Sequence, residues 1–320
     1  MIFEKKILDI YKKQLITRND HLSMVHYYSH GDFEGLLCTP YSFISGQGQR
    51  LYGAFYYYNV KDTRKIVIFE HGLGGGHRSY MKEIEMLCRG GFTVFSYDHT
   101  GCGISEGDNI RAFSQSICDL DMCITSLRNS EEYRDADISV VGHSWGGLSS
   151  LNIGALHPDI THIVAISAPI SVKAMISQFF SSIMRIFVPA VMRYEKEQNP
   201  IHATLSAQES LKSTSASVMV IHSKDDPTVK YDSHFKVLEA ALKERENTVF
   251  VSTEGKAHNP NYTASAVQYK DAFFADLTEK TRSGYFDNEE KCSAFKKSYD
   301  FWKMTEQDET LWEKILKFLK

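Results

Sequence analysis

One serine in this chain has the local sequence that nucleophilic chemistry requires: Gly142-His143-Ser144-Trp145-Gly146. The apolar run 138–141 precedes it, and small residues and helix formers follow it at 147–153, which predicts a strand, a sharp turn and a helix. The backbone at such a turn is strained, at a cost on the order of 1–3 kcal/mol, and the turn presents the serine hydroxyl. Glycines two residues to either side carry no Cβ, so the helix can pack close to the strand. The sequence therefore predicts a nucleophile at Ser144.

A serine needs a base to take its proton during attack. The apolar runs Val218–Ile221 and Thr248–Val251 predict two later strands, and reactive groups in open α/β sheets gather at the carboxyl ends of strands. Asp225 and Asp226 follow the first of these strands, and His258 follows the second. The order serine, acid, histidine is that of hydrolases with this strand–turn–helix serine. Either aspartate could orient the imidazole.

The elements that must position these residues alternate along the chain. Short apolar runs predict strands at 65–70, 92–97, 138–141 and 162–167, and helical patterns lie between them at 80–88 and 113–128. Residues 42–58 predict a hairpin that precedes the first of these strands. Strands that alternate with helices predict an α/β fold with a doubly wound, mostly parallel sheet.

Two segments interrupt the alternation. Residues from about 171 to 214 are apolar and helical, and residues from about 262 to 307 are polar, aromatic and helical. We therefore expect a core formed by residues 1–170 and 215–320, which includes an N-terminal helix and the helical insertion at 262–307. A helical cap is expected at 171–214. Residues 309–319 predict a final amphipathic helix.

Composition excludes several classes of function. The chain has 320 residues, 42% of them hydrophobic, and a net charge of −4, with no dense Lys/Arg stripe for nucleic acid. No stretch reaches the roughly 18 apolar residues of a membrane-spanning helix, and the N-terminus lacks the apolar centre of a secretory signal. The thirteen histidines form no H-E-x-x-H motif, so no metal and no cofactor is expected. Six cysteines without a C-x-x-C pair predict reduced packing residues in a cytoplasmic protein: Cys38, Cys88, Cys102, Cys118, Cys123 and Cys292.

Five motifs in this order resemble the α/β-hydrolase superfamily, and within it the chain is most similar to monoacylglycerol lipases and serine aminopeptidase-like hydrolases. About half of the chain carries the resemblance. The matching segments are His71-Gly72-Leu73-Gly74, Tyr97-Asp98-His99-Thr100-Gly101-Cys102-Gly103-Ile104-Ser105-Glu106-Gly107, Gly142-His143-Ser144-Trp145-Gly146-Gly147, Asp226-Pro227-Thr228-Val229 and Gly255-Lys256-Ala257-His258.

The resemblance implies a role for each matching position. Ser144 would be the nucleophile, and His258 would act first as general base and then as general acid. The family pattern of Asp, two residues and Val selects Asp226 over Asp225 as the residue that orients the imidazole. The backbone N–H groups of Leu73 and Trp145 would form the oxyanion hole.

The substrate pocket is expected in the cap, where apolar residues form a broad stripe at helical spacing. Phe179, Ile183 and Phe187 are the candidate pocket residues, because phenylalanine and its neighbouring methionines suit an adaptable surface for acyl chains. The same stripe could instead pack on the main domain or form a dimer contact. The insertion at 262–307 follows His258 directly, and it is either a second wall of the site or covering structure.

Together, the residues and the resemblance predict a cytoplasmic serine carboxylesterase, or a monoacylglycerol lipase-like enzyme, for esters of small or medium acyl chains. The expected partner is a small ester with an apolar acyl group, and the oligomeric state is open. One alternative is an aminopeptidase or amidase, which would need a carboxylate cluster for an amine, with Glu195 and Glu197 as candidates. Another is a non-catalytic ligand-binding protein with the same fold.

Overall fold

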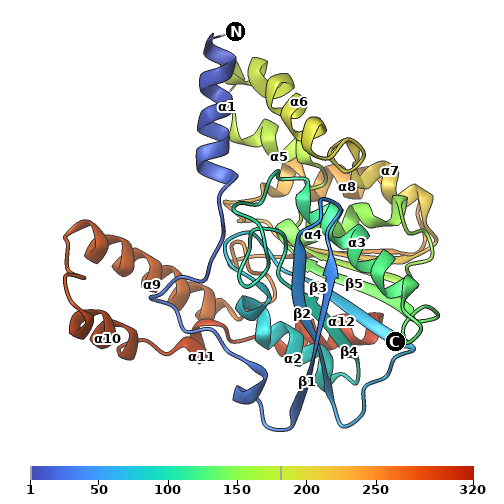
Figure 1. The fold of residues 1–320 in the computed structure, drawn as a ribbon, viewed down its shortest axis with the longest axis horizontal. Coiled ribbons are helices and arrows are strands. Elements are labelled where there is room, and N and C mark those ends of the chain that lie inside the picture. Colours follow the sequence, from blue (N-terminus) through green and yellow to red (C-terminus); the bar gives the residue numbers. More distant parts are fainter. Residues whose placement is uncertain (1, 181) are drawn as a thin grey trace.

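The computed structural model describes residues 2–180 and 182–320. Within these ranges eight strands form one sheet in the order β1-β2-β4-β3-β5-β6-β7-β8 (Figure 1). Only β2 runs against its neighbours, since both of its pairings are antiparallel and all pairings from β4 to β8 are parallel. The strands are β1 (Leu36–Ile44), β2 (Arg50–Tyr58), β3 (Lys65–Glu70), β4 (Thr93–Tyr97), β5 (Asp137–His143), β6 (His162–Ile166), β7 (Ser217–Ser223) and β8 (Thr248–Thr253).

The central strands are buried on both faces, which explains their continuous apolar sequences. Along β3, Ile66 and Ile68 belong to one hydrophobic cluster, whereas Val67 and Phe69 belong to another on the opposite side. This division follows from the strand period of two. The structure confirms the expected doubly wound, mostly parallel sheet.

Helices cover the two faces of the sheet. Side chains of α3, α7 and α8 pack in the first cluster, and those of α2 and α12 pack in the second. The described helices are α1 (Ile2–Leu15), α2 (Met81–Arg89), α3 (Gln115–Asn129), α4 (Trp145–Asn152), α5 (Val172–Phe179), α6 (Val188–Gln198), α7 (Ala207–Ser210), α8 (Phe235–Ala241), α9 (Ala264–Arg282), α10 (Glu289–Lys297), α11 (Phe301–Met304) and α12 (Glu309–Phe318), with short 3-10 turns between some of them.

Residues 171–214 form helices α5, α6 and α7 between β6 and β7, as expected, although residue 181 lies outside the described residues. The N-terminal helix α1 packs against this segment (Figure 1). Tyr11 of α1 shares a hydrophobic cluster with Met175 of α5 and Val191 of α6. Part of the apolar stripe of this segment therefore packs against α1, whereas Phe179 and Ile183 stay exposed.

The insertion after His258 forms an arm that protrudes from the sheet (Figure 1). Helices α9, α10 and α11 enclose a small aromatic core of their own, which includes Phe273, Phe295 and Phe301. Met24 and Val25, from the segment that follows α1, pack against this core. The segment that follows α1 thus packs against the C-terminal arm.

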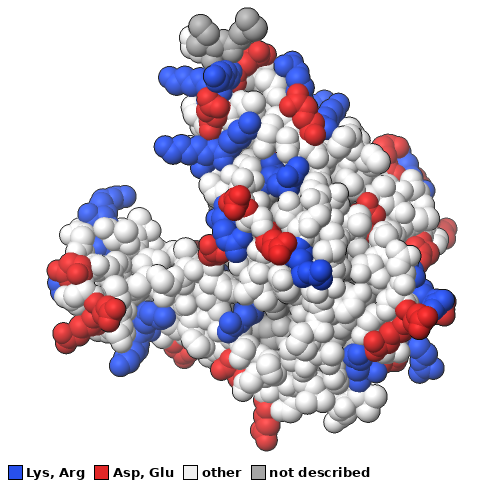
Figure 2. Space-filling view, viewed as in Figure 1, with Lys and Arg blue, Asp and Glu red and all other residues white. Residues whose placement is uncertain are grey.

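On the face shown in Figure 2, basic and acidic side chains are interspersed over the surface. No described helix combines the length and the apolar character that crossing a bilayer requires. Among the described residues no group of three or more His, Cys, Asp or Glu side chains is arranged to hold a metal ion.

Candidate active site

Ser144 lies in the turn between β5 and α4, with a backbone φ of 55° and ψ of −114°. A positive φ is unfavourable for a residue with a side chain, so surrounding contacts must hold it. One of these is the hydrogen bond from the Ser144 N–H to the Ile166 carbonyl of β6, at 2.8 Å. A Cβ on Gly142 would collide with the carbonyl oxygen of Gly146, and one on Gly146 with that of Glu70. The two glycines therefore permit the close approach of helix to sheet that positions the serine.

The structure brings the serine, the histidine and one aspartate together at the carboxyl ends of β5, β7 and β8. The Oγ atom of Ser144 lies 2.8 Å from Nε2 of His258, and Nδ1 of His258 lies 2.7 Å from Oδ2 of Asp226. Because a carboxylate can only accept, Nδ1 carries the proton and Nε2 presents its lone pair to the serine hydroxyl. The Asp226 side chain is inaccessible to solvent, and that of His258 is 20% exposed.

Asp226 is held as an anion by the groups around it. Its Oδ1 accepts hydrogen bonds from the N–H groups of Thr228 and Val229, at 2.8 and 3.0 Å. Burial raises the pKa of Asp226, but hydrogen bonds from His222 and His258 outweigh burial and hold this pKa below its ordinary value. A negatively charged carboxylate therefore faces the imidazole.

Asp225, the other candidate, has a different set of contacts. Its two oxygens accept hydrogen bonds from the N–H groups of Gly255 and Ala257, at 3.0 and 3.1 Å, and one also binds the Ser223 hydroxyl. Asp225 thus anchors the turn that precedes His258, whereas Asp226 contacts the imidazole directly.

Two buried histidines fix the loops around the serine. His143 lies between the Tyr80 hydroxyl, at 2.9 Å, and the carbonyl oxygen of His258, at 2.8 Å. Burial and the neighbouring His258 lower the pKa of His143 to about 3, so it holds the His258 backbone as a neutral ring. His71 accepts a hydrogen bond from the His99 N–H and binds the Gly72 carbonyl, which fixes the loop after β3.

Of the two N–H groups expected to form an oxyanion hole, one belongs to Trp145, which follows the serine, and the other to Leu73, which lines the same cavity as the serine. Trp145 is the first residue of α4, where an N–H has no acceptor within the helix, and Leu73 lies in the loop after β3. Within the described chain, no acceptor takes a hydrogen bond from either N–H. Both donors are therefore available to a ligand.

A cavity of about 270 Å³ opens beside Ser144 and His258. Its walls come from the segment after α1, from the loop after β3 and from the C-terminal arm. The lining residues are Leu22, Val25, Tyr27, Gly72, Leu73, Gly74, Ser79, Tyr80, His143, Ser144, His258, Asn259, Tyr262, Lys270, Phe274, Met304 and Thr305.

The three side chains expected to form the pocket, Phe179, Ile183 and Phe187, do not line this cavity. Phe179 is 54% exposed and Ile183 is 81% exposed. Helical periodicity identifies an apolar stripe but does not tell which neighbour the stripe faces. The arm at 262–307, for which the sequence left two interpretations open, does form a wall of the cavity.

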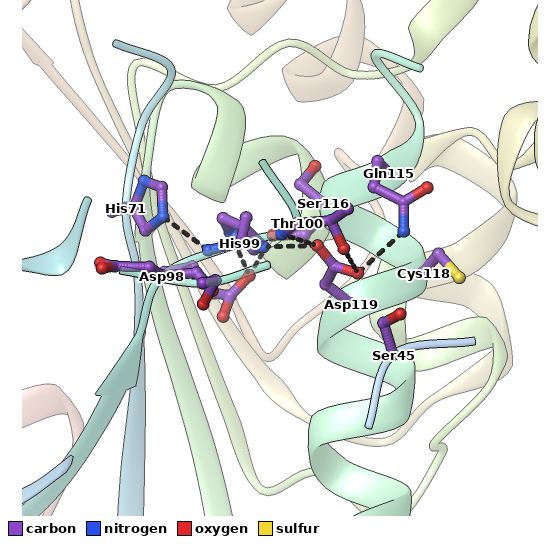
Figure 3. A network of polar contacts seen from close by, with 12 residues as sticks. Ser45, His71, Asp98, His99, Thr100, Gln115, Ser116, Cys118 and Asp119 are labelled. Carbon is purple, nitrogen blue, oxygen red and sulfur yellow. Dashed lines mark hydrogen bonds and ion pairs between the residues drawn. The ribbon is translucent and has the colours of Figure 1, made fainter. Parts of the chain in front are cut away.

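A network of buried polar groups surrounds His99 (Figure 3), whose ring centroid lies 4.9 Å from that of Trp145, the residue after Ser144. His99 is wholly buried, with Nε2 3.3 Å from Glu70 and Nδ1 3.4 Å from Asp119. Asp119 also accepts hydrogen bonds from the backbone N–H and the hydroxyl of Thr100. Burial by itself lowers the pKa of His99, but the two carboxylates outweigh burial and raise this pKa to about 9.

This buried imidazolium predicts a pH dependence of stability. The pKa of an unfolded histidine is about 6.5, and that of folded His99 is about 9. Between these pH values the folded protein holds a proton on His99 that the unfolded chain has released. The free energy of unfolding therefore falls as pH rises through this window. Urea midpoints measured across this window should fall, and His99→Gln should flatten the slope. In the control His162→Gln the slope should persist, because burial lowers the pKa of His162 and keeps it neutral there. A wild-type urea midpoint that stays constant from pH 6.5 to 9 would contradict the positive charge assigned to His99.

Known proteins resemble this chain in sequence and in fold. The model of the family "Serine aminopeptidase, S33" matches residues 61–211. An esterase from Pyrococcus furiosus has a similar structure, with a TM-score of 0.57 and 20% sequence identity, and the match covers 85% of this chain and 97% of that one. Together with the strand order and the turn at Ser144, these likenesses show that the chain has an α/β-hydrolase fold.

The curated proteins that match this chain in sequence include monoglyceride lipases. The chain is 30% identical over 118 residues to the monoglyceride lipase of Rattus norvegicus, a match covering 36% of this chain and 38% of the lipase. It is 29% identical over 118 residues to the monoglyceride lipase of Homo sapiens, again covering 36% of this chain and 38% of the lipase. The chain therefore matches well under half the length of these relatives.

Proposed function

We propose that this protein is a serine ester hydrolase that cleaves carboxylic esters of small or medium acyl chains, in the manner of a carboxylesterase or monoacylglycerol lipase. The observation that carries the proposal is the continuous set of hydrogen bonds from Ser144 through His258 to Asp226. The similarity to monoglyceride lipases and to an esterase fold supports it.

In the proposed reaction, Ser144 Oγ attacks the ester carbonyl while its proton passes to Nε2 of His258. The N–H groups of Leu73 and Trp145 stabilise the oxyanion, and Asp226 stabilises the imidazolium. The carbon–oxygen bond to the alcohol then breaks, and His258 returns the proton to the leaving alkoxide. Water attacks the acyl-enzyme in the same way: its proton passes through His258 to Ser144 Oγ as the acid leaves.

The cavity size favours a small substrate. Its volume of about 270 Å³ lies just below the roughly 300–1,000 Å³ of drug-sized ligand sites. Short acyl groups are therefore expected to be preferred over long ones.

The aminopeptidase alternative has less support. Glu195, a candidate for binding an amine, is buried, and its carboxylate already accepts hydrogen bonds from the Tyr11 hydroxyl and from the N–H groups of Phe113 and Ser114. Glu197 is exposed, and neither glutamate lines the cavity beside Ser144.

Two features of the wider protein remain proposals. Residues 171–214 are proposed as a cap on a core of residues 1–170 and 215–320, supported by their shared cluster with α1. A cytoplasmic location is proposed, and it is supported by the absence of disulfides among the six cysteines.

The test is covalent labelling together with a substrate panel. A fluorophosphonate probe is expected to label the wild-type protein on the peptide that contains Ser144, as read by mass spectrometry. Among 4-nitrophenyl esters of two to twelve acyl carbons, kcat/KM should be highest for short chains and should exceed that for aminoacyl anilides. Faster cleavage of anilides would favour the peptidase alternative. Absence of both labelling and turnover would favour a non-catalytic ligand-binding protein.

A further inference from the structure

A lysine from the C-terminal arm lies in the wall of the same cavity as Ser144 and His258. Lys270, on α9, donates a hydrogen bond from Nζ to Oδ1 of Asn259 at 2.8 Å, and its ammonium lies 5.4 Å from the ring centroid of Tyr262. No described carboxylate forms an ion pair with it. The cavity thus contains a cation whose described partners are a neutral amide and a ring face.

The environment of Lys270 destabilises its charged form. Burial lowers the pKa of Lys270, and the more distant charges of Glu83 and Asp271 offset burial only in part. Glu83 is itself buried, and its Oε1 accepts a hydrogen bond from Asn261 at 3.1 Å. Lys270 is half-buried, and an ammonium withdrawn from water is stabilised by a paired anion, so an anionic group on a ligand would stabilise it.

A second observation, on another wall of the same cavity, also indicates a polar ligand. The hydroxyl of Ser79 is buried and has no hydrogen-bond partner among the described residues. Buried hydroxyls in proteins are normally paired, so this group has bonding capacity left for a ligand. Leu73, Phe274 and Met304 supply apolar wall between the polar groups.

We propose that Lys270 binds an anionic group of the substrate, so that the preferred esters are short and carry a carboxylate on the acyl or the alcohol side. This inference rests on the proposed ester hydrolase function, and it differs from the purely apolar acyl group that the cap sequence predicted. Ser144 and Lys270 both line this cavity of about 270 Å³, and this small volume is the reason to expect a short ester.

The experiment compares matched anionic and neutral esters. On the acyl side the pair is mono-4-nitrophenyl succinate and 4-nitrophenyl butyrate. On the alcohol side it is 4-acetoxybenzoate and its methyl ester. For each pair the ratio of kcat/KM values, anionic over neutral, is measured in wild type, Lys270→Gln and Lys270→Arg. Dividing the variant ratio by the wild-type ratio removes the intrinsic reactivity of each ester.

Lys270→Gln is expected to lower this ratio by about tenfold to a hundredfold for one of the two pairs, because a hydrogen bond to a charged group is lost. Glutamine can still donate to Asn259. Lys270→Arg should restore most of the ratio, since the charge is kept. The control Lys280→Gln, on the same helix but paired with Asp276 outside the cavity, should leave both ratios unchanged.

Unchanged ratios in Lys270→Gln for both pairs, with active enzyme on neutral esters, would overturn this inference and leave the ester hydrolase proposal intact. Absence of turnover for every ester would instead overturn the proposed function. Wild-type protein gives an independent readout: succinate should inhibit competitively at lower concentration than its diamide. Equal inhibition by both would contradict the proposed anion site.

Discussion

Ser144→Ala is expected to lower kcat for ester hydrolysis by about 10⁴- to 10⁶-fold and to abolish fluorophosphonate labelling, because loss of the nucleophile in serine hydrolases has effects of this size. The Oγ atom makes its hydrogen bond to His258, and the turn is held by backbone contacts that alanine preserves. The variant should therefore fold, with an unchanged circular dichroism spectrum. Activity is measured under single-turnover conditions on a short 4-nitrophenyl ester.

A matched control separates the loss of the nucleophile from the loss of any serine hydroxyl. Ser177 lies on α5, and its hydroxyl bonds to the Lys173 carbonyl on the surface. Ser177→Ala is expected to keep the wild-type rate and labelling. If folded Ser144→Ala retained more than about a hundredth of the wild-type rate, Ser144 would not be the nucleophile.

The sheet could be predicted from the sequence because each central strand is buried on both faces. A strand of this kind must be apolar throughout, and runs such as Lys65–Glu70 and His162–Ser167 agree with β3 and β6 to within a residue. The turn at Ser144 could also be predicted, because its need for residues without a side chain appears in the local sequence as Gly142 and Gly146.

The walls of the cavity could not be predicted, because they depend on contacts between segments distant in sequence. Val25 and Phe274 line one cavity only because the segment after α1 packs against the C-terminal arm. The stripe that contains Phe179 does not face this cavity: some of its members, such as Val191, pack in a cluster with Tyr11 of α1, and Phe179 itself is exposed. Periodicity reports that a face is apolar, and it carries no information on which partner covers it.

The order of residues along the chain leaves open which of the adjacent aspartates orients His258, and the family pattern selects Asp226. The geometry gives a way to test this choice. Asp226→Asn is expected to lower kcat by about 10⁴-fold. An amide that donates toward Nδ1 of His258 favours the tautomer with its proton on Nε2, and that ring cannot accept the proton of Ser144. Labelling by the fluorophosphonate should slow in parallel with kcat.

Asp225→Asn is the matched control, with the same change of charge one residue away. Its contacts are the backbone N–H groups of Gly255 and Ala257, so asparagine weakens the turn before His258 without changing the tautomer of the imidazole. We expect kcat within about tenfold of wild type and a lower urea midpoint, because the loss falls on a turn and not on the proton transfer. A larger loss of kcat in Asp225→Asn than in Asp226→Asn would show that Asp225 supplies the charge facing His258 during turnover, and the order of the hydrogen bonds described above would then be wrong.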